Sequence, residues 1–188
     1  KPGVTTLALT DGMAEALLRN VMRNARLALQ KPADYDVRAE IMWAGTLSHN
    51  DITGDRSQGD WASHQLEHEL GGMFDIAHGA GLAAIWGSWA RYVLKQNPCR
   101  FAQLAVNVLN VPYSFGNDEK TALEGIAAME DFFRSIGMPT SISDMEIELT
   151  DTQIKELAHK CSFMGRRTIG GFVTLNAADM ENIYRMAR

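Results

Sequence analysis

The chain has 188 residues, 46% of them hydrophobic and 22% charged, which is typical of one globular domain and too apolar for a disordered protein. Its 18 Lys and Arg against 23 Asp and Glu give a formal net charge of −5, and without a basic run this argues against a nucleic-acid partner. No apolar stretch approaches the roughly 20 residues that span a bilayer, and no signal-peptide pattern opens the sequence. We therefore expect a cytoplasmic protein with neither a nucleic-acid nor a membrane partner.

Apolar residues recur at three- and four-residue steps along almost the whole chain, which predicts helices. The predicted helices span, in chain order, about 10–30, 34–47, 60–71, 78–96, 98–108, 117–136, 150–157 and 176–188. The helix that begins near His78 is rich in Ala, Gly and Trp and nearly uncharged, so we expect it in the centre of the core. No alternating run of β-branched residues is long enough for a strand of ordinary length. The predicted fold class is all-α, a bundle of about eight helices.

Polar residues and glycines mark where several of these helices begin and end. Thr10 or Asp11 is placed to cap the first helix, and Asn117 to cap the sixth. Thr150 and Asn176 each precede a Gln or Asp by three residues, the spacing of a capping box or a similar N-terminal cap. The Gly71-Gly72 pair suits a helix C-terminus, so we expect the third helix to end there.

The two cysteines, Cys99 and Cys161, are far apart in the sequence and form neither a disulfide framework nor a Cys-x-x-Cys metal site. We expect two buried thiols in a reducing compartment. The sequence also begins Lys1-Pro2-Gly3, without an initiator Met, and we expect a piece of a longer protein.

Three of the five histidines lie within fifteen residues, at His64, His68 and His78. His64 and His68 are four residues apart, so they lie on one face of a helix about one turn apart. His78 follows the predicted Gly-Gly break, where the next helix can turn back toward them. Imidazole is a common ligand of Zn²⁺ and Fe²⁺, and this crowding makes the three residues candidates for a metal site.

One interpretation of this spacing is a protease. His64-x-x-Glu67-His68 matches the H-x-x-E-H pattern of inverted zinc proteases, in which both histidines bind zinc and the glutamate activates water. Such a site needs a further carboxylate ligand downstream, for which Glu146 and Glu148 are the candidates.

A second interpretation uses His64 and His78 as metal ligands, with His68 beside the metal. A third has no metal and treats the chain as a non-catalytic helical binding module whose histidines bond separately to backbone carbonyls. The spacing alone does not choose among the three. Because desolvating three imidazoles without a shared role costs stability, a common site is favoured.

Several stretches of the chain carry a family likeness: Tyr35-Asp36-Val37-Arg38-Ala39-Glu40-Ile41-Met42-Trp43-Ala44, Asp60-Trp61-Ala62-Ser63-His64, His68-Glu69-Leu70, Ala77-His78-Gly79, Phe132-Phe133-Arg134-Ser135-Ile136-Gly137-Met138-Pro139, Arg166-Arg167-Thr168-Ile169-Gly170 and Ile183-Tyr184-Arg185-Met186-Ala187. With the His-x(3)-His-x(9)-His spacing in a Gly-rich helical pair, they resemble the iron-containing (group III) alcohol dehydrogenases, in particular the butanol dehydrogenase branch. The resemblance implies the helical C-terminal domain of that family, whose fold is of the dehydroquinate synthase type.

The resemblance also implies roles for the histidines. In that family one Asp and three His hold the metal, and the last two of these ligands correspond to His64 and His78. His68 corresponds to an extra histidine near the nicotinamide and the substrate, which implies a catalytic proton relay. The Asp and the first His form an Asp-x-x-x-His pair that precedes the matched region. Asp60-x-x-x-His64 has the same spacing but aligns with the later motif.

By the same resemblance, residues 1–188 are the helical half of a two-domain dehydrogenase whose N-terminal dinucleotide-binding domain is absent from this chain. Gly79-Ala80-Gly81 does not supply the strand-to-helix fingerprint of a nucleotide site. We expect the absent domain to be this chain's partner. Without that domain, apolar surface around the histidines is uncovered, so we also expect a homo-oligomer.

The implied cofactors are a divalent iron or zinc ion and, in the full-length enzyme, NAD(P). The implied reaction is reversible hydride transfer between NAD(P)H and a small aldehyde or ketone, with the metal as Lewis acid. Since half of the metal ligands precede the chain, we expect the isolated fragment to bind metal weakly and to be inactive.

Residues near the histidines receive supporting roles. Glu67 and Asp75 are candidates to accept a hydrogen bond from the ring nitrogens that do not face the metal. We expect three aromatic residues to pack the site walls or the core, and two other histidines to have no function. The aromatic residues are Trp61, Phe74 and Trp86, and the histidines are His49 and His159.

Overall fold

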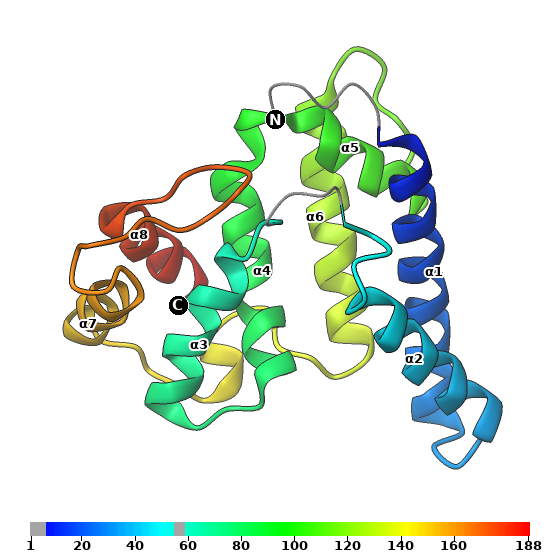
Figure 1. The fold of residues 1–188 in the computed structure, drawn as a ribbon, viewed down its shortest axis with the longest axis horizontal. Coiled ribbons are helices and arrows are strands. Elements are labelled where there is room, and N and C mark those ends of the chain that lie inside the picture. The colour runs from blue at the N-terminus through cyan, green and yellow to red at the C-terminus, as the bar shows by residue number, and fades with distance from the viewer. Residues whose placement is uncertain (1–6, 55–58) are drawn as a thin grey trace.

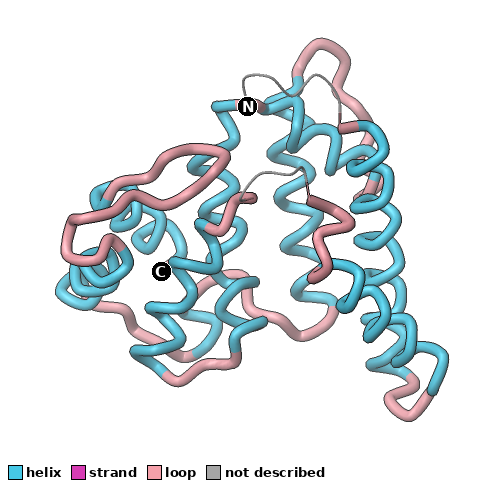
Figure 2. The backbone as a smooth tube through the Cα atoms, viewed as in Figure 1, coloured by secondary structure: helices cyan, strands magenta, loops and turns pink. Residues whose placement is uncertain are grey.

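The computed structural model describes residues 7–54 and 59–188, and in this part of the chain it consists of helices joined by loops (Figures 1 and 2). The α-helices are α1 (Ala8–Gln30), α2 (Tyr35–Ser48), α3 (Ala62–Phe74), α4 (His78–Val93), α5 (Pro98–Asn107), α6 (Asp118–Ser135), α7 (Asp151–Cys161) and α8 (Ala177–Ala187), with short 3-10 turns at Leu94–Gln96 and Ser143–Met145. The described β-structure is one isolated bridge between Ile169 and Leu175. The predicted all-α bundle is confirmed.

Helix α4 lies between two groups of helices (Figure 1). On one side it packs against α3 and α8, and α7 packs against both of these. On the other side α4 packs against α6, which pairs with α5, while α1 and α2 form a helical hairpin at the edge of the molecule. The expected central place of α4 is confirmed.

The apolar core has two clusters, and the larger one extends across α4 to Phe101 of α5 and Ile126 of α6. The larger one contains Leu66, Leu70, Ile85, Leu157, Ile183 and Tyr184, from α3, α4, α7 and α8. The smaller one is built around Met22, Val108, Met129 and Phe132. Trp86 on α4 packs against both clusters and so connects them.

Helix α3 is fixed along one side by the C-terminal helices. The buried Tyr184 hydroxyl of α8 donates to the Leu66 carbonyl at 2.6 Å. The buried Cys161 thiol of α7 donates to the Gln65 carbonyl at 3.4 Å. Both contacts lie in the turn of α3 that carries the histidines.

The N-terminus of α3 is held by a carboxylate. Asp60 accepts from the Ala62 amide at 2.9 Å, and it also accepts from the amides of Gly171 (3.1 Å) and Phe172 (2.7 Å). Asp60 therefore ties the start of α3 to the loop that precedes α8.

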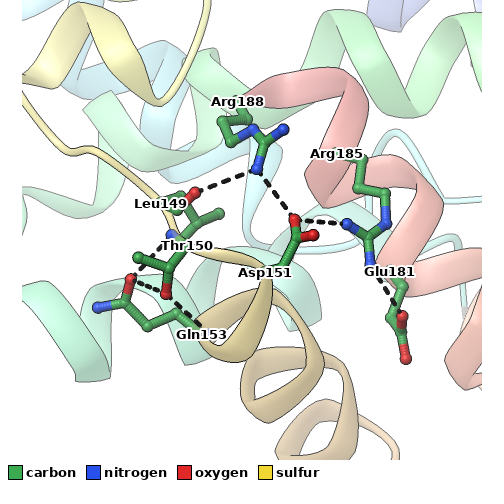
Figure 3. A network of polar contacts seen from close by, with 7 residues as sticks. All are labelled: Leu149, Thr150, Asp151, Gln153, Glu181, Arg185 and Arg188. Atoms are coloured by element: carbon green, nitrogen blue, oxygen red, sulfur yellow. Dashed lines mark hydrogen bonds and ion pairs between the residues drawn. The ribbon is translucent and has the colours of Figure 1, made fainter.

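Helices α7 and α8 are joined by the charged network of Figure 3. Asp151 accepts from Arg185 at 2.7 Å and from Arg188 at 3.0 Å, and Arg188 also donates to the Leu149 carbonyl. Thr150, beside Asp151, forms the predicted capping box with Gln153. The predicted caps at Asn176 and Asn117 are confirmed as well.

The predicted end of the third helix at Gly71-Gly72 is wrong. Helix α3 continues to Phe74, and Asp75 ends it in the left-handed conformation (φ 52°), with its amide donating to the Gly71 carbonyl at 2.9 Å. A Cβ at Gly71 would lie 3.0 Å from Oε1 of Glu67. The glycine is therefore in the helix because a buried acid packs against it.

Two further expectations are corrected. Asp11 does not cap the first helix, because α1 begins at Ala8 and the Asp11 carboxylate accepts instead from Arg100 of α5, at 2.6 and 2.8 Å. Cys161 is buried as expected, but Cys99, in the first turn of α5, is exposed. No described helix is both long and apolar enough to cross a membrane.

Candidate metal centre

The turn between α3 and α4 brings the three clustered histidines together. His64 and His68 lie one turn apart on α3, and His78 is the first residue of α4. The ring centroid of His78 is 5.4 Å from that of His64 and 5.5 Å from that of His68, whereas the two α3 rings are 6.3 Å apart. The tertiary structure therefore gathers the predicted metal ligands and the predicted proton relay in one place.

A buried carboxylate supports this cluster. Glu67 is 2% exposed, and its Oε2 contacts Nδ1 of His78. Of the two acceptors suggested by the sequence, Glu67 is the one that contacts a histidine, while Asp75 is exposed at the end of α3.

Two glycines make room for the Glu67 side chain. A Cβ at Gly81 would lie 2.7 Å from Cγ of Glu67, and a Cβ at Gly71 would lie 3.0 Å from its Oε1. Real Cβ atoms essentially never approach a neighbour as closely as 2.7 Å, so a larger residue at position 81 would force the Glu67 side chain or α4 itself to shift.

The donor set suits a transition metal. Glu67, His68 and His78 each offer a ligand atom, and these atoms all lie within 4.8 Å of one another. Imidazole nitrogens and a carboxylate oxygen are the ligands that Fe²⁺ and Zn²⁺ take in catalytic sites. His64 is outside this tightest group but its ring borders it, so the residues present fit a metal ion although they do not single out one ligand pair.

Electrostatics favour the metal-binding form of His64. The pKa of His64 lies below its ordinary value, first because burial desolvates the imidazolium and then because His78 and His68 repel a positive charge there. His49, for which no function was expected, adds a smaller repulsion. Metals bind neutral imidazole, which this environment favours.

Of the aromatic residues expected near the site, Trp61 borders it. Its ring lies edge-on to His64 with centroids 4.9 Å apart, and 53% of the residue is exposed. Phe74 and Trp86 are partly buried and pack against the larger core cluster. Trp61 therefore forms an apolar wall beside the histidines.

The geometry does not match the two other interpretations. A protease site would pair His64 with His68 and leave His78 apart, yet the ring of His78 is closer to each of them than they are to each other. Glu146 and Glu148 are exposed and do not belong to the described ligand group. A binding module with separately bonded histidines would not gather three rings.

Comparison with known proteins identifies the family. The model of the Fe-containing alcohol dehydrogenase family, C-terminal, matches residues 3–188. The chain belongs to the iron-containing alcohol dehydrogenases. The resemblance carried by the sequence motifs is thereby confirmed.

Relatives within this family include butanol dehydrogenases. The chain is 36% identical over 182 residues to the probable NADH-dependent butanol dehydrogenase 1 of Bacillus subtilis, covering 97% of this chain and 46% of the relative. It is 31% identical to NADH-dependent butanol dehydrogenase A of Clostridium acetobutylicum, again over 97% of the chain and 46% of the relative. The chain spans about half the length of the curated relatives it matches.

Solved structures of the family share the fold. The substrate- and cofactor-free aldehyde reductase YqhD of Escherichia coli superposes with a TM-score of 0.89 at 30% identity, over 98% of this chain and 48% of that one. NADH-dependent butanol dehydrogenase A of Thermotoga maritima gives a TM-score of 0.87 at 28% identity, over 96% and 46%. The helical bundle is therefore the family's C-terminal domain architecture.

Proposed function

We propose that the chain is the metal-binding half of a two-domain NAD(P)-dependent alcohol dehydrogenase that acts on a small alcohol and its aldehyde or ketone. The relatives named above, which are butanol dehydrogenases and an aldehyde reductase, support this reaction class. The observation that carries the proposal is the approach of the His64 and His78 rings to 5.4 Å across the α3–α4 turn.

In this proposal His64 and His78 hold the metal through neutral nitrogens. The remaining ligands, an Asp and a His, would come from the part of the enzyme that precedes this chain. When bound, the metal supplies a Lewis acid for the substrate oxygen. Iron is the ion for which the family is named, and zinc is the alternative with compatible ligand chemistry.

His68 is proposed to move the proton. It is exposed, and its ring lies 5.5 Å from that of His78, so it can exchange protons both with the substrate oxygen and with solvent. Histidine is the side chain used most often for general acid–base catalysis. Trp61 packs edge-on against the His64 ring and places an apolar surface beside the site.

The described residues do not fit a dinucleotide. No strand precedes α4 in this part of the chain, and the space at Gly81 is filled by Glu67 instead of being open to a phosphate. We therefore assign nucleotide binding to the absent half, which is also the proposed partner of this chain. The homo-oligomer and the cytoplasmic location stay predictions.

The metal site is tested by titrating the chain with Zn²⁺ or Co²⁺ and following the histidine imidazole signals by NMR. His64→Ala and His78→Ala should each weaken binding by at least about tenfold, or 1.4 kcal/mol, because each removes a ligand. His159→Ala on α7 is the matched control and should leave the affinity unchanged. Affinities that do not change in the first two variants would contradict the site.

The chain on its own should oxidise no NADH or NADPH with butanal, because it lacks the nucleotide site and half of the metal ligands. Turnover by the isolated chain, or stoichiometric metal that survives dialysis, would contradict the proposal that the nucleotide site and half of the metal ligands lie outside this chain.

A further inference from the structure

We propose that Glu67 is a positioning residue that holds the His78 ring in one orientation and one tautomer, with Nε2 turned toward the metal. This inference deepens the proposed function and rests on it, since it concerns a proposed metal ligand.

The two partners differ greatly in exposure. The Glu67 side chain is 2% exposed, while that of His78 is 52% exposed. An imidazole so exposed, on the first residue of a helix, has little packing to fix its ring. The contact with the buried Glu67 carboxylate therefore holds the His78 ring in place.

The place of Glu67 is itself determined by its neighbours. Its side chain lies between α3 and α4, where a Cβ at Gly81 would meet both its Cγ at 2.7 Å and its Oε1 at 2.9 Å. That same Cβ would lie 2.9 Å from Cδ1 of Ile76, so Ile76 lines this space as well. The carboxylate is confined on the side of α4 and directed toward the start of that helix.

The contact selects a nitrogen. A carboxylate oxygen is a hydrogen-bond acceptor, so the proposal gives Nδ1 of His78 the role of donor in its contact with Oε2 of Glu67. In the neutral ring, Nε2 then keeps its lone pair and is the atom available to a metal. Carboxylates that bind the far nitrogen of a metal-ligating histidine fix its tautomer and raise its basicity.

The tautomer can be measured without any metal. Long-range ¹H–¹⁵N NMR at about pH 8, where imidazole is neutral, distinguishes a protonated Nδ1 from a protonated Nε2. We expect His78 of the native chain to carry its proton on Nδ1. A proton on Nε2 in the native chain would overturn the proposal outright.

Two variants distinguish the effect of the Glu67 hydrogen bond on the His78 tautomer from the effect of side-chain volume. Glu67→Met keeps the volume and removes the acceptor, so His78 should shift toward a proton on Nε2. Glu67→Gln keeps an acceptor oxygen and should retain the native tautomer. His159 serves as an internal control whose signals do not change, and a native tautomer in Glu67→Met would overturn the proposal.

Zinc titration gives the second readout. Glu67→Met should bind zinc about 10- to 100-fold more weakly than the native chain, which is the usual effect of losing such a supporting contact. Glu67→Gln should lose less, and Glu69→Met, two residues along α3, should match the native chain. If Glu67→Gln loses as much as Glu67→Met, Glu67 acts as a ligand and not as a positioning residue.

The two hypotheses fail differently. If His64→Ala and His78→Ala do not weaken zinc binding, the proposed metal site fails whatever the His78 tautomer. If these variants weaken binding but Glu67→Met changes neither tautomer nor affinity, the metal site stands and the role of Glu67 falls.

Discussion

A single buried acid organises the residues around the histidine cluster. Glu67 needs the absence of a Cβ at Gly71 and Gly81, and in return its carboxylate reaches Nδ1 of His78. Leaving such an acid without its partner costs free energy, because a buried polar group loses its hydrogen bond. Gly71 and Gly81 therefore act through packing and not through backbone freedom.

Gly81→Ala tests this packing without altering either polar residue. The added Cβ would overlap the Glu67 side chain, so the carboxylate should move away from His78, and zinc binding should weaken by about tenfold or more. Titration calorimetry measures the effect. Gly72→Ala is the control, because nothing described lies within 4 Å of a Cβ there and only a small gain in helix stability is expected. Equal zinc affinity in both variants would contradict the packing argument.

At the scale of helices, hydrogen bonds with other elements hold α3 in place. Its N-terminus is bound through Asp60 to the loop before α8, and its middle accepts from Tyr184 and Cys161. Burial raises the pKa of the Cys161 thiol to about 11, so this group stays a neutral donor. The helix that carries two of the histidines is thus bonded to α7, to α8 and to the loop between them.

The attachment of α1 to α5 depends on pH. Arg100 donates to Asp11 and holds the pKa of that carboxyl below its ordinary value, although partial burial opposes the shift. Because the folded pKa is the lower one, this contribution to stability is complete above about pH 4 and is lost as the pH falls through the folded value.

Asp11→Asn should therefore lower the free energy of unfolding at neutral pH by about 1 kcal/mol or less, the usual range for a solvent-accessible pair. It should also flatten the pH dependence of stability below about pH 4. Urea unfolding followed by circular dichroism across this range measures both effects. Glu148→Gln, at an exposed position, is the control, and identical acid profiles for Asp11→Asn and the native chain would contradict the assignment.

On the scale of the whole molecule, the α1–α2 hairpin leaves apolar side chains in solvent. Tyr35, Met42 and Trp43 of α2 are all more than half exposed, whereas among the histidine neighbours Trp61 alone is a large apolar residue exposed to this degree. Exposed apolar side chains grouped on one helix are typical of an interaction surface. In the described part of the chain, exposed apolar side chains thus occur on the hairpin as well as beside the metal centre.

We expect the isolated chain to self-associate through this hairpin. Replacing Met42 and Trp43 together by Ser should weaken the association by about tenfold or more, as measured by sedimentation at several concentrations. Phe115→Ser, on the loop between α5 and α6, is the control for a general loss of apolar surface. A native chain that stays monomeric at high concentration would contradict the expectation.

The positions of the helices follow from the sequence because their signals are local. The caps at Asn117, Thr150 and Asn176 bond to amides within three residues, and the apolar period repeats within one turn. The spacing of His64 and His68 is local in the same way, which is why the sequence identifies the cluster. His78 joins the cluster because it lies only ten residues after His68 in the sequence, and the likeness of the motifs to a known family supports the same three histidines.

Several features that depend on tertiary contacts were wrong or undecided at the sequence level. Gly71 and Asp11 were interpreted as a helix end and a cap, but distant partners determine their roles, Glu67 packed under α4 in one case and Arg100 of α5 in the other. The choice of Glu67 over Asp75 depends equally on how closely α4 approaches α3. Local hydrogen bonds and periodicity are encoded within a few residues, whereas burial and ion pairing require segments far apart in the chain to meet.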